Sequence, residues 1–460
     1  MLVFTIIRDF LSMPAFLLGL VTLFGLLLQK KPRDYIIKGT ITTIVGYTLL
    51  SIGSSVLENG VLHDFSVLFD YVFHIQGVIP NMEAVTSLGI SAYGVLVSEV
   101  MFLGMIANLV IARFSSLKYI FLTGHHTLYM ACLLVVVFCQ NGMYDWQVVI
   151  SCSLILGLLM SLSPYLLRKD MEAVTGNDKL AYGHFSSLGC YVAGKVAHLV
   201  KNKTYTDRKK DVEFSVKLSF MKDSTVCIFI VMTFIFILLT GMAASQTDLA
   251  SLDIAYYANQ KQHWSIYAIT QGALFSCSIY IILAGVRMMI AEIVPAFKGI
   301  SKKLVPDSKL AVDCPVIFSY APNAVMAGFI MSFLGGILVM LGLIVINSFT
   351  NTGIPVIIPG VVSHFFCGGS AGVFANAKGG TRGCIIGSLA HGVLITILSL
   401  LAMPMLGSLS LTGTAFSDSD FCFAGIVFGN LIRFLSNTNV FLVCIFCFLL
   451  PILMRYRKTK

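Results

Sequence analysis

The sequence predicts an all-α polytopic membrane protein, and three observations lead to that prediction. Of the 460 residues, 57% are hydrophobic and only 12% are charged, whereas soluble domains carry about twice that charged fraction. Continuous apolar runs such as 132–138 and 226–239 argue against a membrane β-barrel, because barrel strands alternate apolar and polar residues. The mean hydropathy of +0.88 requires several apolar segments of about 20 residues, the length that a helix needs to span a bilayer.

We expect about eleven membrane crossings from the apolar runs. They lie near 11–29, 39–57, 92–112, 119–139, 147–166, 224–242, 264–290, 326–347, 355–374, 384–404 and 438–454. The stretch 421–432 is too short to span and is expected at the outer interface. An odd number of crossings places the two termini on opposite sides of the membrane.

The charge distribution gives the orientation. The net charge is +9, from 31 Lys and Arg against 22 Asp and Glu. Basic residues concentrate at 30–38, at 201–222 and in the tail 455–460, and cytoplasmic loops are the ones that retain Lys and Arg. The acidic or neutral connections, including Asp418 with Asp420, are therefore assigned to the outside. No contiguous basic face is visible, so nucleic-acid binding is not expected.

Three segments do not fit simple membrane spans: 76–91, 171–198 and 305–325 are semi-apolar and contain Gly, Pro, His and acidic residues. Non-helical backbone at membrane depth persists only where protein or a water-filled cavity satisfies its polar groups. We expect re-entrant hairpins or broken helices there, and with them the transport site.

A weak internal repeat agrees with this expectation. Residues 36–46 resemble 296–305, and each copy is followed by a Pro-Asn step, at 80–81 and at 322–323. Interrupted segments at matching positions in two halves are typical of an inverted repeat.

Ionisable residues inside membrane segments are expensive, so each is a candidate functional residue. His125 and His126 open an apolar span, and His184, Glu83 and Asp313 lie in the three irregular segments. Structural alternatives stay open: a histidine can face water at a helix end, Asp313 can cap a helix, and Glu83 can pair with a lysine.

Metal, nucleotide and redox chemistry are not indicated by the sequence. Adjacent helical residues point about 100° apart, so His125 and His126 do not form a metal site by themselves, and no Cys/His cluster completes a coordination shell. No phosphate-binding loop of the G-x-x-x-x-G-K-[ST] type occurs. Cys444 and Cys447 lie in an apolar run without a charged neighbour. We therefore expect no metal and no cofactor.

Three stretches carry a family resemblance: KGTITTIVGYTLLSIGSSVL, IFLTGHHTLYMA and GVRMMIAEIVPAFKGISKKLVPDSKLAVDCPVIFSYAPNAVMAGF. They resemble the ascorbate-specific IIC permease of the bacterial phosphotransferase system, the SgaT/Ula family. The resemblance implies a homodimeric inner-membrane transporter with eleven transmembrane segments and two re-entrant hairpins. It also implies a single permease domain over 1–460, with core and dimer-scaffold parts and no IIA or IIB domain.

The resemblance also implies a substrate site and partners. The family's sugar-contacting positions fall on the set Met82, Glu83, His125, His126, Thr127, Leu128, Tyr129, His184, Phe185 and Asp313. Phe185 and the pair at 82–83 depart from the best-known branch, so the implied substrate is L-ascorbate or a related sugar acid or polyol. Separate cytoplasmic IIB and IIA proteins would perform the phosphoryl transfer while a core slides against the scaffold.

The chemistry of such a site contains a conflict. Ascorbate is an acidic enediol that needs a positive environment, which histidines and helix N-termini can supply. Glu83 and Asp313 would together disfavour an anion, unless Glu83 is paired with a lysine or donates a proton. Two rivals stay open: an ion-coupled secondary transporter that uses Glu83 or Asp313 as its proton site, and a membrane enzyme that acts on lipid.

The orientation is testable. We predict that residue 1 is outside and that the 201–222 loop and the tail are cytoplasmic, because these two regions hold the densest Lys and Arg. A fluorescent reporter that folds only in the cytoplasm, fused after Lys460, should be bright, and cysteines placed in the 201–222 loop should resist an impermeant reagent added from outside. A dark tail reporter would contradict the count of crossings.

Overall fold

The computed structural model describes residues 14–74, 76–144, 146–178, 180–201, 223–254, 263–291, 304–305, 307–350 and 352–458. Residue 1, nearly all of the basic loop at 201–222 and most of the repeat copy at 296–305 lie outside the described residues.

The described chain is mostly helical, as the sequence predicts. The helices are α2 (Pro14–Leu28), α3 (Arg33–Val56), α4 (His63–Phe73), α5 (Met82–Phe114), α6 (Gly124–Gln140), α7 (Trp146–Leu166), α8 (Arg168–Thr175), α9 (Ser187–Val200), α10 (Ser224–Ala244), α12 (Trp264–Ile290), α14 (Pro315–Phe318), α15 (Pro322–Thr350), α16 (Val361–Ser363), α17 (Gly369–Ala402), α18 (Ser419–Phe434) and α19 (Asn437–Lys458). The π-helical turns are η1 (Leu57–Leu62) and η4 (His364–Gly368), and short 3₁₀ turns are η3 (Leu249–Ser251), η5 (Met403–Met405) and η6 (Gly407–Leu411).

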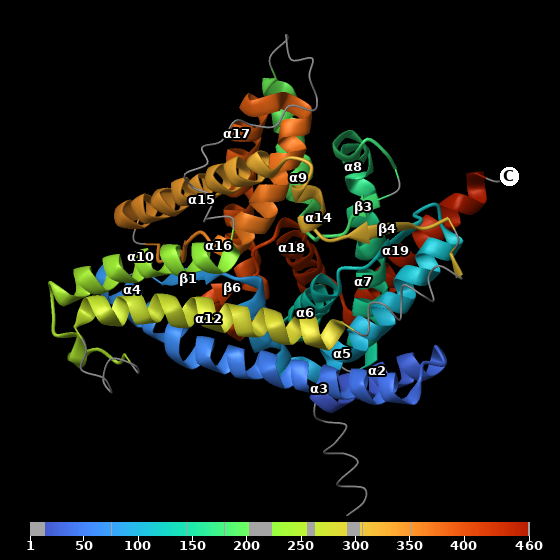
Figure 1. The fold of residues 1–460 in the computed structure, drawn as a ribbon, viewed down its shortest axis with the longest axis horizontal. Coiled ribbons are helices and arrows are strands. Elements are labelled where there is room, and N and C mark those ends of the chain that lie inside the picture. Colours follow the sequence, from blue (N-terminus) through green and yellow to red (C-terminus); the bar gives the residue numbers. More distant parts are fainter. Residues whose placement is uncertain are drawn as a thin grey trace, which may run out of the picture.

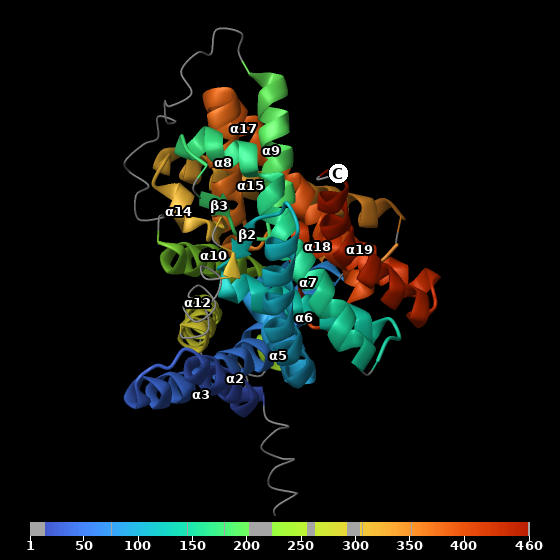
Figure 2. The ribbon, with the colours of Figure 1, turned by 90° about the vertical axis from the view of Figure 1, so that its right-hand side faces the viewer.

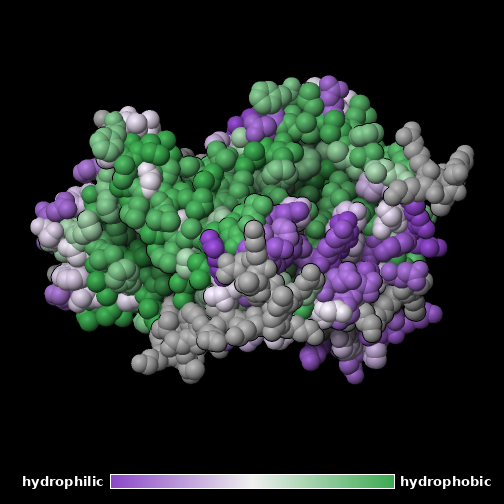
Figure 3. All heavy atoms as spheres, turned by 90° about the horizontal axis from the view of Figure 1, so that it is seen from above, coloured by the Kyte–Doolittle hydropathy of each residue, from purple (hydrophilic) through white to green (hydrophobic). Residues whose placement is uncertain are grey.

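Several of these helices have the properties of membrane spans. Among the described residues, seven helical stretches are long and apolar enough to cross a membrane, and α6 and 228–244 are shorter apolar helices. Viewed from above, hydrophobic residues cover much of the upper and left part of the face, and hydrophilic residues gather mainly from its centre to the lower right (Figure 3). The protein is therefore a multi-pass membrane protein, while the count of eleven crossings stays a prediction.

Two three-stranded sheets interrupt the helical fold, and the sequence did not predict them. Their strands are β1 (Gly77–Pro80), β2 (Tyr119–Phe121), β3 (Leu180–Tyr182), β4 (Lys309–Val312), β5 (Val356–Ile357) and β6 (Thr414–Ala415). One sheet has the order β5-β1-β6 and the other β2-β4-β3, and every pair is parallel. Strands of two to four residues are too short to show an alternating pattern.

The order of the strands interlocks the two halves of the chain. The middle strand β1 comes from the N-terminal half and pairs with β5 and β6 from the C-terminal half. The middle strand β4 comes from the C-terminal half and pairs with β2 and β3 from the N-terminal half. Each sheet therefore forms only when distant segments of the chain meet.

The irregular segments that the sequence singled out contain these strands. Segments 76–91, 171–198 and 305–325 hold β1, β3 and β4 respectively, and in each the strand is followed by a loop and then a helix. The non-helical backbone that we predicted in these segments is confirmed. Its depth in the membrane stays a prediction. The Pro-Asn step at 80–81 ends β1 just before α5, whereas the step at 322–323 begins α15, and α14 lies between β4 and α15.

Two long helices are interrupted rather than continuous. α5 has a non-helical residue at Tyr93, and α17 breaks at Gly380, whose φ of 63° lies in the left-handed region that glycine tolerates. The separate crossings predicted at 355–374 and 384–404 are therefore parts of one interrupted helical stretch. The stretch 421–432 lies in α18, which packs against α6, α9 and α17.

The helices form two packed groups. α2, α3, α10 and α12 pack against one another as long, roughly parallel or antiparallel rods along the lower side of Figure 1; we call them the rod layer. α4 packs against α10, and the other helices form the larger body, in which α9, α15 and α17 pack together and α5, α6 and α7 form a second bundle (Figure 2). α12 also contacts α5 and α6, so the two groups meet at the site described below.

Close helix contact in the larger body depends on glycine. A Cβ atom added at Gly328 in α15 would lie 2.5 Å from the carbonyl oxygen of Gly368, whereas one added at Gly342 in the same helix would meet nothing within 4 Å. Small residues permit this kind of backbone approach in membrane helices.

We therefore predict that Gly328→Ala destabilises the protein by about 1–3 kcal/mol, the cost of overpacking a tight core. Gly342→Ala should leave stability within about 0.5 kcal/mol, since surface substitutions usually have small effects. Thermal unfolding of both purified variants in detergent provides the comparison, and equal melting temperatures would show that the α15–α17 contact is looser than described.

Candidate functional site

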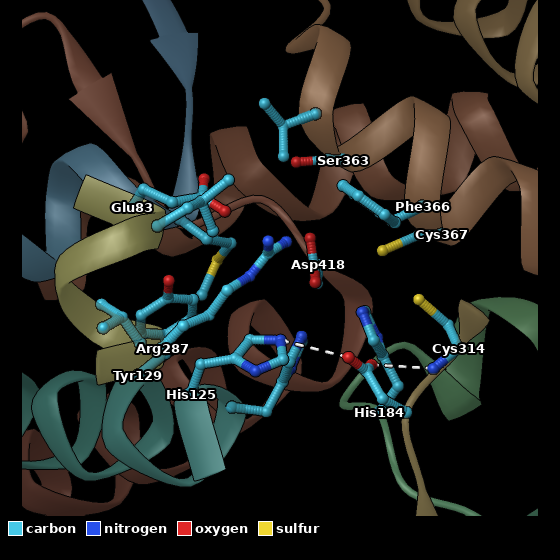
Figure 4. Close-up of a pocket in the computed structure, with 16 residues that line it drawn as sticks. Glu83, His125, Tyr129, His184, Arg287, Cys314, Ser363, Phe366, Cys367 and Asp418 are labelled. Carbon is cyan, nitrogen blue, oxygen red and sulfur yellow. Dashed lines mark hydrogen bonds and ion pairs between the residues drawn. The ribbon is translucent and has the colours of Figure 1, made fainter. Parts of the chain in front are cut away.

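A pocket lies where the two sheets face each other. All six strands run toward the start of a helix: β1 leads to α5, β2 to α6, β3 to α9, β4 to α14, β5 to α16 and β6 to α18. The residues that follow the strands line the pocket, together with a few residues of α6, α12 and η4 (Figure 4). Parallel strands that end at the same edge place these residues close together although they are distant in sequence.

The β5-β1-β6 sheet contributes an acidic wall. Met82 and Glu83 follow β1, Ser363 ends α16, which follows β5, and Asp418 follows β6. The Ser363 hydroxyl donates to Ser417 Oγ at 2.5 Å, and the Ser417 hydroxyl donates to the Asp418 carboxylate at 3.0 Å. Within the described part of the chain, the buried Glu83 Oε2 has no hydrogen-bond partner. This wall therefore offers carboxylate oxygens to a ligand.

The β2-β4-β3 sheet contributes the histidines. His125 and His126 follow β2, His184 follows β3, and Asp313 and Cys314 follow β4. His125 Nε2 lies 3.6 Å from Asp313 Oδ2, and the rings of His126 and His184 are 3.7 Å apart between centroids. The Cys314 N–H donates to Asp313 Oδ1 at 2.7 Å, which fixes the direction of that carboxylate.

The third wall is α12 of the rod layer, which contributes Leu283, Val286 and Arg287. In Figure 4 the Arg287 side chain reaches into the pocket between Glu83 and Asp418. Among the described residues no carboxylate is within ion-pair distance of its guanidinium. A positive charge thus faces the pocket from the opposite helical group, and it is available to a ligand.

Helix N-termini add to this positive field. α5, α6, α9 and α18 all begin at the pocket, and the exposed N–H groups of a helix start favour negative charge. Asn81 caps α5 by accepting a hydrogen bond from the N–H of Ala84 at 2.8 Å. The pocket therefore combines carboxylates and histidines that can bind hydroxyls with a guanidinium and helix ends that can bind an anion.

The structure brings most of the predicted site residues together. Met82, Glu83, His125, His126, Tyr129, His184 and Asp313 all line the pocket. Thr127 and Leu128 do not: both are buried in α6, and the Thr127 hydroxyl donates to the Thr123 carbonyl at 3.1 Å. Phe185 does not either, since it is fully buried and stacks on Phe121. These three residues therefore pack in the interior, although the family resemblance implied that they contact the substrate. Substrate contact by the whole set stays a prediction.

Several pocket residues were missed by the sequence analysis. Arg287 lies in an apolar run, and an isolated arginine there is itself a signal of function that could have been used. Asp418 was assigned to an external acidic connection, yet only 3% of it is exposed and it lines the pocket. Ser363, Cys314 and Cys367 carried no signal in the sequence.

A half-buried carboxylate outside the pocket lining, Asp420, ties two pocket loops together. Its side chain accepts hydrogen bonds from the Leu188 N–H at 2.7 Å and from the Ser163 hydroxyl at 2.9 Å, and its own N–H donates to the Phe185 carbonyl at 3.2 Å. Leu188 lies in the first turn of α9, so the carboxylate also faces a helix N-terminus. Asp420 thereby holds the loop of His184 beside the loop of Asp418.

The pocket also contains groups with the side chains of a metal site. The described residues hold three such groups: His125 with His126 and Asp313, His126 with His184 and Asp418, and His184 with Asp313 and Cys314. In each group one ligand atom per residue lies within 4.8 Å of the others. The sequence analysis expected no metal site because His125 and His126 point apart on a helix and no Cys/His cluster is visible in the sequence; the structure gathers these residues from segments that are distant in the chain.

Comparisons with known proteins agree with this architecture. Residues 9–420 match the family described as PTS system sugar-specific permease component, EIIC-GAT. The chain is also similar to a protein named ascorbate-specific PTS system EIIC component, from Mycoplasma pneumoniae, at 28% identity over 421 residues. The match covers 82% of this chain and 63% of that relative.

The Asp420 link gives a prediction about stability. Removing a partner from a buried hydrogen-bond network costs about 1–3 kcal/mol, so Asp420→Ala should lower the melting temperature markedly. Asp420→Asn retains an acceptor for the Leu188 N–H and should lose less. Thermal unfolding of both variants in detergent, with the exposed Asp253→Ala as control, measures the difference. A stable Asp420→Ala would show that the two loops are held by other contacts.

Proposed function

The chain belongs to the PTS sugar-specific permease component family, and on that premise we propose that it carries L-ascorbate, or a closely related sugar acid, into a bacterial cell. The Mycoplasma relative bears the name of an ascorbate permease component, and this chain spans about 63% of its length. The observation that carries the proposal is the composition of the pocket, whose lining combines the guanidinium of Arg287 with several carboxylates and histidines.

The pocket chemistry fits an ionised enediol. Arg287 and the converging helix N-termini supply positive charge beside the carboxylates, which eases the conflict that Glu83 and Asp313 created in the sequence analysis. The carboxylates of Asp313 and Asp418 can accept hydrogen bonds from the neutral hydroxyls, and histidines offer both donor and acceptor nitrogens. A neutral polyol would give Arg287 no ionic partner, so the guanidinium favours a sugar acid over a polyol.

The proposed transport step is a movement of the larger body against the rod layer. Support comes from the division of the pocket: Arg287 lies on α12, whereas the other polar lining residues lie on elements of the larger body. Sliding of one group past the other would carry the sugar away from Arg287 and open the pocket to the opposite side. The interlocked order of the sheets supports the inverted repeat that such a movement uses.

Partners and assembly follow from the family. A cytoplasmic IIB protein, itself phosphorylated through IIA, would transfer the phosphoryl group to the sugar, and this chain would act as the transport subunit. We propose a homodimer in the membrane, in which one of the exposed apolar helix faces is covered. α3 offers such a face through Ile37, Ile41, Val45 and Ile52.

The function is tested in proteoliposomes loaded with phosphorylated IIB. We expect radiolabelled ascorbate to accumulate as its phosphate, and to accumulate far less when IIB is absent or unphosphorylated. Uptake driven by a proton gradient without IIB would instead identify the ion-coupled transporter.

Substitution of Arg287 tests whether the pocket recognises the negative charge of ascorbate. Because a hydrogen bond to a charged group contributes about 1.5–3 kcal/mol, Arg287→Gln should weaken ascorbate binding by roughly 10- to 150-fold. Arg287→Lys should weaken it less, since it keeps the charge but loses the planar donors. Arg33→Gln at the exposed start of α3 serves as the control. Unchanged binding by Arg287→Gln would contradict the proposed recognition of an anion.

A further inference from the structure

We propose that His184, Asp313 and Cys314 bind one Zn²⁺ ion, or a similar transition-metal ion, and that the bound metal blocks the substrate pocket. The blocking part of this proposal rests on the proposed function, because His184 and Asp313 are also the predicted partners of the sugar. The metal site itself rests only on the arrangement of the three side chains.

The three side chains are positioned by two neighbouring strands. Asp313 and Cys314 directly follow β4, and His184 follows β3, which pairs with β4 in register from Leu180–Leu310 to Tyr182–Val312. Their ligand atoms lie within 4.8 Å of one another. Bond lengths to zinc of about 2.0–2.3 Å place the ligands of a tetrahedral site roughly 3.3–3.8 Å apart. Rotation of the side chains that moves the ligand atoms about 1 Å closer together would therefore give the spacing of a tetrahedral zinc site.

The hydrogen bonds of the histidines select this group over the two groups that contain His126. His184 Nδ1 lies 3.0 Å from Ser186 Oγ, and Ser186 Oγ lies 2.9 Å from the Tyr182 hydroxyl. Ser186 can accept from Nδ1–H while it donates to Tyr182, which leaves Nε2 free as a ligand, and in Figure 4 a ring nitrogen of His184 points into the pocket. His126 differs, because its Nδ1 accepts the Phe185 N–H at 3.4 Å and its proton is therefore on Nε2.

The ligand types select the metal. Thiolate and imidazole favour Zn²⁺ and similar ions over Mg²⁺ and Ca²⁺, which prefer oxygen ligands. A thiolate and a carboxylate would together balance the charge of Zn²⁺, and Asp418 and Glu83 add negative charge nearby. Binding would release the Cys314 thiol proton to solvent, so the affinity should fall as the pH is lowered. Three protein ligands leave a fourth position for water.

The site is tested first without sugar. Purified full-length protein in detergent is titrated with Zn²⁺ by calorimetry and with Co²⁺ by absorption spectroscopy. We expect one ion per chain and a thiolate-to-cobalt charge-transfer band, and we expect Cys314→Ser to abolish the band and to weaken Zn²⁺ binding at least about tenfold, since even loss of a supporting group costs that much. Cys367→Ser, which changes the other cysteine that lines the pocket, should keep both properties.

Several results would overturn the metal site: no Zn²⁺ binding, or Zn²⁺ binding and a charge-transfer band that are unchanged in Cys314→Ser. If Cys314→Ser does not fold in detergent, His184→Gln is the second variant, and it should lose the affinity while thiolate absorption also weakens.

The second measurement is competition. Zn²⁺ should raise the apparent Kd of radiolabelled ascorbate for the wild type and not for Cys314→Ser, which also controls for Zn²⁺ complexes with ascorbate in solution. Simultaneous binding of both ligands would overturn the blocking role. The two proposals fail separately: ascorbate binding without Zn²⁺ binding removes only the metal site, and Zn²⁺ binding without ascorbate binding removes only the proposed substrate.

Discussion

The structure depends on one constraint: irregular backbone inside an apolar helical protein must find hydrogen-bond partners within the protein. Here six short strands meet that requirement by pairing as two parallel sheets, each assembled from both halves of the chain. Because every strand ends at the start of a helix, the same pairing that satisfies the backbone also gathers six loops around one pocket. The fold and the site thus have a common physical origin.

The sequence predicted the helical membrane fold and much of the pocket, because both leave local signals. Apolar runs of sufficient length identify helices, and His125, His184 and Asp313 are conspicuous as polar residues in apolar surroundings. The sheets left no such signal, since a strand of two to four residues becomes stable only through a partner more than a hundred residues away. Which of the adjacent residues at 125–129 face the pocket was equally a matter of tertiary packing: Tyr129 reaches the pocket and Leu128 does not.

The missed residues show where local reasoning fails. Asp418 and Asp420 look like a solvated acidic turn, yet Asp418 is buried and Asp420 is half-buried, because the fold supplies partners that the linear sequence does not reveal. Ser417 donates to Asp418, and the start of α9 donates to Asp420, from a segment 232 residues earlier in the chain. A buried carboxylate is tolerated when it accepts such hydrogen bonds, and these bonds exist only after the two halves have interlocked.

The placement of charge links the architecture to transport. The carboxylates and histidines of the pocket belong to the larger body, and its guanidinium belongs to the rod layer. An anionic sugar bound between them would pair with Arg287 and donate hydroxyl hydrogen bonds to the surrounding carboxylates, and so bridge the two groups. When no sugar is bound, Glu83, Asp313 and Asp418 face the pocket beside Arg287, and this excess of acidic groups would attract a cation. On the two proposals above, the same side chains recognise a sugar acid while Arg287 faces them and a transition-metal ion when the sugar is absent, and the position of α12 relative to the two sheets would decide which ligand the pocket favours.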